Sequence, residues 1–110
     1  MIKGEPKFEE EGGIEQRLVE LLREKGVEDE GVRSALINWT IEHERQVQES
    51  SDPEAVPRFV IRQAHLYLKA GYVTEALESF EAARMWAWNK GRDELYQAIV
   101  KEMNEIEDSL

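Results

Sequence analysis

The stretch of sequence that decides the fold is PRFVIRQAHLYLKAGYVTEALESFEAARMWAWNK, residues 57–90. Its apolar residues recur every three or four positions on both sides of Gly71, which is the pattern of two amphipathic helices joined by a tight turn. Ala64 and Ala83 would let two antiparallel helices approach closely, and Tyr67 and Phe80 would fill the space beside them. The stretch therefore predicts an antiparallel helical hairpin.

The rest of the chain shows the same helical period. Three further helices are expected over about residues 14–25, 31–49 and 93–107, in addition to two over about 57–70 and 74–90. No segment alternates apolar and polar residues over the length of a strand, and the three prolines and seven glycines fall at expected helix ends or loops. We therefore predict an all-α fold of about five helices, packed as a single helical domain over residues 14–110 in which residues 91–110 form a closing helix.

Residues 1–13 differ in composition from the rest of the chain. They carry four Glu, two Lys, one Pro and three Gly, and only Ile2 and Phe8 could anchor them to a core. This composition predicts a flexible acidic arm. The alternative is an acidic tail that masks a basic surface.

The hairpin over residues 57–90 resembles the tetratricopeptide repeat (TPR), a helix–turn–helix unit of 34 residues. Besides the residues named above, Gly71, Ala76 and the spacing from Ala76 to Phe80 carry the resemblance. The hairpin departs from the repeat at Val60, Gln63 and Trp88, where Trp, Leu and Pro are usual. The resemblance covers this hairpin and the helix after it, in which Ala98 takes the place of the next small residue.

The TPR resemblance also implies where a partner would bind. In that family the first helix of each unit lines a concave surface, which here implies a partner-binding surface formed by Arg58, Ile61, His65, Leu68, Lys69 and Arg92. Chaperone-binding members hold a terminal carboxylate with Lys, Asn and Arg. This chain has Ile61 and His65 where the first Lys and the Asn would stand, so that clamp is not expected.

Charge is distributed unevenly along the chain. The formal net charge is −10, but residues 57–92 hold six basic and three acidic side chains, a net of +3, and the remaining residues sum to −13. An acidic chain is a poor general ligand for phosphate backbones, so no nucleic-acid partner is expected. The basic island (residues 57–92) predicts a groove for an acidic or C-terminal peptide. The alternative is that acidic side chains of the same chain neutralise it.

No pattern in the sequence predicts catalysis, a metal or a cofactor. The chain has no Cys, which excludes a disulfide scaffold and any Cys-based metal site. His43 and His65 are not spaced with other ligands on one helix, and we expect His43 to be a half-buried helical histidine. Gly12-Gly13 lacks the Lys and Ser/Thr of a phosphate-binding loop. The sequence predicts neither a signal peptide nor a membrane span, so a cytoplasmic protein is expected.

The function predicted from these features is that of a small non-enzymatic adaptor or scaffold. It would bind a protein or peptide through the surface of the third to fifth helices. The alternative is a structural module that forms a homodimer through the same surface. Trp86 and Trp88 point to different sides of their helix, so one is expected in the core and one nearer the surface. The alternative is that both are buried, between the fourth and fifth helices or against an added subunit. An exposed Trp beside Met85 would mark an interface anchor.

Overall fold

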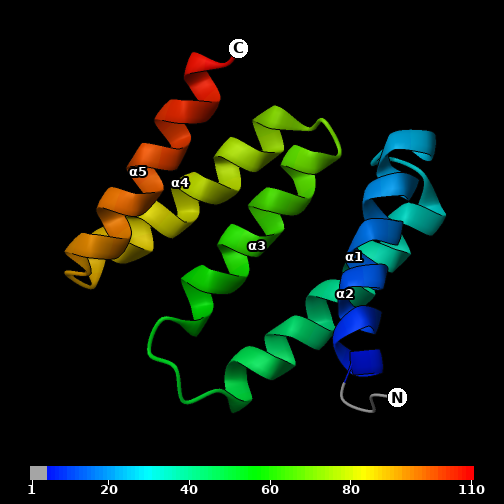
Figure 1. Ribbon diagram of the computed structural model, residues 1–110, viewed down its shortest axis with the longest axis horizontal. Helices are drawn as coiled ribbons and strands as arrows, with labels where there is room; N and C mark the ends of the chain where they lie inside the picture. The colour runs from blue at the N-terminus through cyan, green and yellow to red at the C-terminus, as the bar shows by residue number, and fades with distance from the viewer. Residues whose placement is uncertain (1–4) are drawn as a thin grey trace.

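The computed structural model describes the backbone of residues 5–110 and the side chains of residues 13–110. This part of the chain forms five helices and no strand: α1 (Glu5–Lys25), α2 (Glu30–Glu49), α3 (Ala55–Lys69), α4 (Val73–Asn89) and α5 (Asp93–Asp108) (Figure 1). The predicted all-α fold is confirmed over these residues.

The helix ends agree with the predicted ones except at the start of α1. The sequence places that start near Ile14, whereas α1 begins at Glu5. Of the flexible acidic arm predicted for residues 1–13, residues 1–4 lie outside the described residues and residues 5–13 form the beginning of α1, with side chains described only from Gly13.

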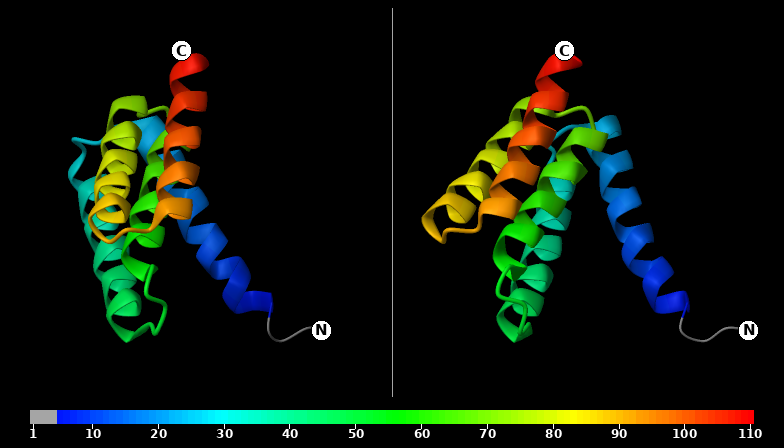
Figure 2. Two further views of the ribbon diagram at one scale, coloured as in Figure 1. Left: turned by 90° about the vertical axis from the view of Figure 1, so that its left-hand side faces the viewer. Right: turned by 60° about the vertical axis from the view of Figure 1, so that its left-hand side comes forward.

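Helix α3 lies in the middle of the molecule and contributes to two hydrophobic cores. The pair α1 and α2 lies on one side of α3, and α4 with α5 lies on the other (Figures 1 and 2). Leu66 and Ala64 sit two residues apart, so they point to opposite sides of the helix. Leu66 packs into the first core and Ala64 into the second. This placement makes α3 the element that holds the two halves of the chain together.

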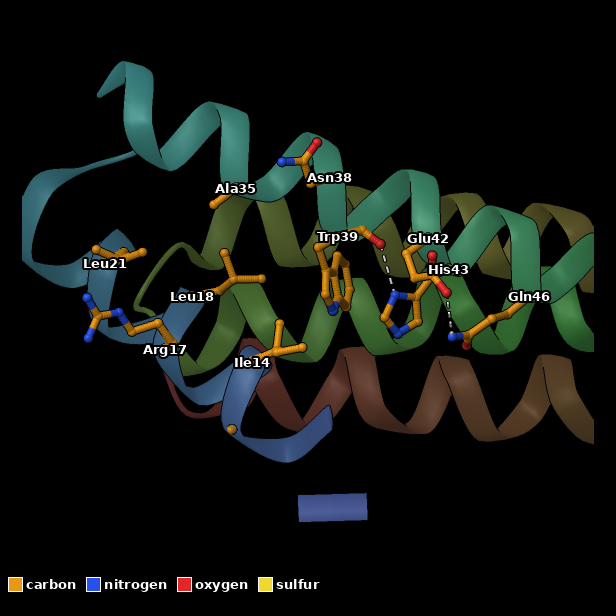
Figure 3. A pocket seen from close by; sticks show the side chains of 11 residues that line it. Ile14, Arg17, Leu18, Leu21, Ala35, Asn38, Trp39, Glu42, His43 and Gln46 are labelled. Atoms are coloured by element: carbon orange, nitrogen blue, oxygen red, sulfur yellow. Dashed lines mark hydrogen bonds between the residues drawn. The ribbon is translucent and has the colours of Figure 1, made fainter. Parts of the chain in front are cut away.

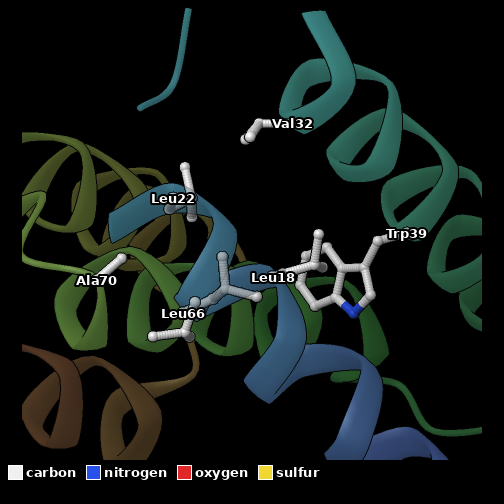
Figure 4. Packing of buried hydrophobic residues seen from close by; sticks show 7 residues of the cluster. Leu18, Leu22, Val32, Trp39, Leu66 and Ala70 are labelled. Atoms are coloured by element: carbon white, nitrogen blue, oxygen red, sulfur yellow. The ribbon is translucent and has the colours of Figure 1, made fainter. Parts of the chain in front are cut away.

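The first core joins α1 and α2 to α3. Figure 4 shows Leu18 of α1 lying between Trp39 of α2 and Leu66 of α3, and Leu22 lying between Val32 and Ala70. Its buried members are Leu18, Val19, Leu22, Val32, Trp39, Leu66 and Ala70. Leu18 and Leu22 are four residues apart in α1, and Val32 and Trp39 are seven residues apart in α2, which is the helical period that the sequence predicts for these stretches.

The second core is built on a close approach of α3 and α4. Ala64 of α3 and Ala76, Phe80, Ala83 and Ala87 of α4 are all completely or almost completely buried. Alanine at these places removes the side-chain bulk that would hold two helices apart. The predicted use of Ala64 and Ala83 as contact points of the hairpin is therefore confirmed.

The turn between α3 and α4 is made by Gly71. Its φ of +90° lies in the left-handed region, which residues with a Cβ rarely adopt. The Gly71 amide donates to the carbonyl of Leu68 at 3.0 Å, and the Tyr72 amide donates to that of Tyr67 at 2.9 Å. These bonds satisfy the last carbonyls of α3 and reverse the chain, as the sequence predicts for this glycine.

Two long-range hydrogen bonds connect the turns of the two hairpins. The Tyr72 hydroxyl donates to the Leu22 carbonyl at 3.2 Å and accepts from the Val27 amide at 3.2 Å. Nearby, the Arg23 guanidinium donates to the Lys69 carbonyl. The end of α1 is thereby attached to the end of α3.

Helix α5 closes the second core with one face and presents a polar face to solvent. Ile99 and Ile106 are buried, whereas Gln97, Lys101 and Glu105 are exposed. Ala98, which the TPR resemblance places where a small residue is usual, is exposed too, because no further helix among residues 5–110 packs against that side of α5. Within the part of the chain that the structure describes, no helix is long and apolar enough to cross a membrane.

Candidate protein-docking surfaces

The six residues predicted to bind a partner do not form one open surface. Ile61 and Leu68 are half-buried and pack against the second core. The other four are polar: Arg58, His65 and Lys69 on α3, and Arg92 at the start of α5. Only these polar members, with the exposed edges of Ile61 and Leu68, could meet a ligand.

Two of the predicted arginines converge on acidic residues of the α2–α3 connection. Nε of Arg58 lies 2.9 Å from Oδ2 of Asp52, and its Nη2 lies 3.2 Å from Oε1 of Glu54. Nη1 of Arg92 lies 3.7 Å from Oε2 of the same Glu54. Glu54 therefore links the beginnings of α3 and α5 through a shared carboxylate.

The basic side chains farther along α3 are paired with the flanking helices. Arg62 forms an ion pair with Glu15 of α1, and Nε2 of His65 contacts the carboxylate of Glu102 in α5. Lys69 is exposed, and together with Arg62 and His65 it lines a hollow of about 200 Å³ between α1 and α3. These pairs favour the alternative in which the acidic parts of the chain neutralise the basic island.

The outer edge of α4 and α5 carries an exposed aromatic cluster. The Trp88 side chain is 65% exposed, and its ring lies 5.4 Å from that of Tyr96 on α5, measured between centroids. Met85, one turn earlier on the same face of α4, is also exposed. Trp86 instead packs at the margin of the second core, so the prediction of one inner and one outer Trp is confirmed.

Arg84 holds this edge together. Its guanidinium donates to the Tyr96 hydroxyl at 3.1 Å and to Oε1 of Glu81 at 2.8 Å, and it lies over the Tyr96 ring at 5.7 Å. The hydrogen bond from Arg84 lowers the pKa of Glu81, and the same bond raises the pKa of Arg84. The aromatic cluster is therefore bounded by a fixed, fully ionised pair.

A larger hollow lies between α1 and α2, on the side away from α3. This α1–α2 groove has a volume of about 640 Å³ and is lined from α1 by Ile14, Arg17, Leu18 and Leu21, and from α2 by Ala35, Trp39 and others (Figure 3). Ile14 and Leu18 point toward Trp39 in that view. The volume falls within the range of ligand pockets, and the walls are mainly apolar.

The α2 wall of the groove contains two polar atoms without a partner. His43 Nδ1 lies 2.9 Å from the Trp39 carbonyl, which can only accept, so Nδ1 carries the hydrogen. His43 Nε2 and Trp39 Nε1 are both buried and have no hydrogen-bond partner among the described residues. Each such atom costs about 1–3 kcal/mol. His43 itself is half-buried against the Trp39 and Phe59 rings, as predicted.

Sequence reasoning did not identify the α1–α2 groove. The helical spacing of Ile14, Leu18, Leu21 and Trp39 shows which face of each helix is apolar but not whether a neighbour covers that face. No pattern in the sequence indicates that Arg17 lines a groove. Among the described residues, no three acidic or histidine side chains converge where they could hold a metal ion.

Comparison with protein-family models, curated proteins and solved structures finds no match for this chain.

Proposed function

We propose that this chain is a small non-enzymatic scaffold that binds a protein partner through the surface of α3–α5, with Trp88 as the anchor. The observation that carries the proposal is the 65% exposure of Trp88 at the end of a helix whose inner face is fully packed. Aromatic side chains on rigid elements dominate binding energy at protein interfaces.

The surroundings of Trp88 support this role. Its contact with Tyr96 and the bonds from Arg84 to Tyr96 hold the cluster in one arrangement before binding. A preorganised anchor loses little side-chain entropy when a partner docks. Met85 extends the apolar area, and the charged side chains of Arg84 and Glu81 form a polar rim.

We also propose that the α3–α4 hairpin is a TPR-like unit with α5 as its closing helix. The buried Ala64, Ala76 and Phe80 and the left-handed Gly71 stand at the positions on which the resemblance depends. The exposed Ala98 supports the same interpretation, because a small residue stands there without the following helix that would cover it. The polar face of α5 suits the end of such a stack.

The proposal is tested by capture with the immobilised chain from a lysate of its source, comparing wild type with Trp88→Ala. We expect one or more proteins to bind the wild type and to be lost with Trp88→Ala. Ile37→Ala is the control, because Ile37 is an exposed apolar residue on α2. Proteins retained equally by Trp88→Ala would overturn the proposed anchor.

Two further measurements separate the other binding modes. Loss of the captured protein with Arg58→Glu and Lys69→Glu, but not with Trp88→Ala, would show that the partner binds at the residues predicted from the sequence. Light scattering of Trp88→Ala tests the homodimer alternative. A dimer that dissociates in this variant would show that the α3–α5 surface binds a second copy and not another protein.

A further inference from the structure

We propose that a second copy of this chain covers the α1–α2 groove, giving a two-fold dimer in which the α1–α2 pairs of both copies pack as four helices. This proposal does not depend on the Trp88 anchor, which lies on α4.

The groove is an apolar surface that no described residue covers. Ile14 is 54% exposed at its α1 wall, and Leu21 is half-buried on the same wall. The corresponding apolar faces of α3 and α4 are covered by α5, whose Ile99 and Ile106 become buried there. The α3–α4 pair thus has an apolar neighbour in α5, whereas the described residues provide none for the α1–α2 groove.

A head-to-tail arrangement of copies is disfavoured by α5. In a row of copies arranged head to tail, the outer face of α5 in one copy would fill the α1–α2 groove of the next copy. That face carries Gln97, Lys101 and Glu105, all exposed, and burying them against Ile14 and Trp39 would leave charges without water or partners. A two-fold arrangement avoids this cost, because the groove then faces a second groove of the same chemistry.

The charges along the groove are self-complementary under a two-fold axis. Of the described lining residues, Arg17 and Glu42 carry a formal charge, and Figure 3 shows them toward opposite ends of the groove. An axis across the middle of the groove, near Leu18 and Trp39, places the Arg17 end of one copy over the Glu42 end of the other. Arg17 has no ion pair within the described part of the chain, whereas Glu42 is shared with Arg45.

The first test is the oligomeric state of the full chain, measured by sedimentation velocity and light scattering over a range of concentrations. We expect a dimer for the wild type. Ile14→Glu should raise the dimer dissociation constant by about tenfold or more, because it places a carboxylate in the apolar interface. Ile41→Glu is the matched control, because Ile41 is 58% exposed on α2 but does not line the groove. The dimer of this variant should have the same dissociation constant as the wild type.

The second test reverses the charges of Arg17 and Glu42, which face each other in the proposed dimer. Arg17→Glu and Glu42→Arg should each weaken the dimer, and the double variant should restore most of the lost affinity, since it reverses both members of each pair. Circular dichroism confirms that the variants remain helical, which is expected because both side chains are exposed.

Three results would overturn the proposal. A wild-type chain that stays monomeric at all concentrations excludes the dimer. A dimer that dissociates in Ile41→Glu but not in Ile14→Glu places the interface elsewhere on α2. A dimer that is sensitive to Trp88→Ala and insensitive to Ile14→Glu assigns self-association to the α3–α5 surface. Loss of the protein-binding function of Trp88 would leave the dimer unaffected, so the two proposals fail separately.

Discussion

The hydroxyl of Tyr72, at the turn between α3 and α4, donates a hydrogen bond of 3.2 Å to the carbonyl of Leu22 in α1. These residues belong to different helical hairpins, and the same hydroxyl accepts from the Val27 amide in the α1–α2 loop. One side chain therefore attaches the first hairpin to the second at the point where both chains reverse direction. The bond helps to set how the α1–α2 groove is placed relative to α3.

Replacing Tyr72 with Phe tests this connection. The substitution keeps the ring and removes the hydroxyl, which leaves the half-buried Val27 amide without an acceptor. We expect a loss of about 1–2 kcal/mol in the free energy of unfolding, measured in urea. Tyr67→Phe is the control, because the Tyr67 hydroxyl has no hydrogen bond among the described residues, although burial raises its pKa. Equal losses from both variants would contradict a role for the Tyr72 bond.

The left-handed turn at Gly71 predicts opposite effects of the same substitution at two glycines. Gly71→Ala introduces a Cβ where φ is +90° and no atom lies within 4 Å, so the cost is conformational and about 1–2 kcal/mol. Gly13→Ala lies within α1, also in open space, and should stabilise the helix by about 0.5–1 kcal/mol. Thermal unfolding of both variants measures the difference, and an unchanged melting temperature for Gly71→Ala would contradict the proposed TPR-like turn.

The ion pair between Arg84 and Glu81 predicts an acid-side dependence of stability. The pair lowers the pKa of Glu81, so its stabilising contribution is present at pH values above the ordinary carboxyl pKa and is lost as the pH falls through the native pKa. The titration midpoint of the Glu81 carboxyl, followed by its NMR chemical shift, should lie below the ordinary pKa of Glu. Arg84→Gln should raise this midpoint toward the ordinary pKa. The effect on stability is small, because the pair is still reached by solvent, with the Arg84 side chain 28% and the Glu81 side chain 47% exposed. An unchanged midpoint in Arg84→Gln would exclude the pair as the cause.

The two neighbouring tryptophans predict a contrast between stability and binding. Trp88→Ala should change the free energy of unfolding by less than about 0.5 kcal/mol, because the side chain is mostly exposed. Trp86→Ala should cost about 1–2 kcal/mol, roughly half the value of fully burying a large apolar side chain. Urea denaturation of the two variants provides the comparison. A large destabilisation by Trp88→Ala would mean that Trp88 serves the fold and would undermine its use as a binding anchor.

The partners of the basic side chains over residues 57–92 could not be predicted from the sequence. The excess of basic side chains over residues 57–92 was visible in the composition, and both its use for a partner and its neutralisation within the chain were open. The structure brings Glu15 from α1 to Arg62 and Glu102 from α5 to His65. These partners lie in other helices, far along the chain, so no local pattern could identify them.

The sequence by itself determined the helices, the hairpin over residues 57–90 and the turn at Gly71. These features depend on side chains three or four positions apart and on the backbone freedom of one residue, which are local properties. Tertiary structure alone decided that Trp88 faces outward, that the α3 arginines are paired, and that Ile14 and Trp39 border an open groove. Exposure and pairing depend on how α1–α2 and α4–α5 are placed around α3, and that placement is set by contacts between residues distant in sequence, such as Tyr72 and Leu22.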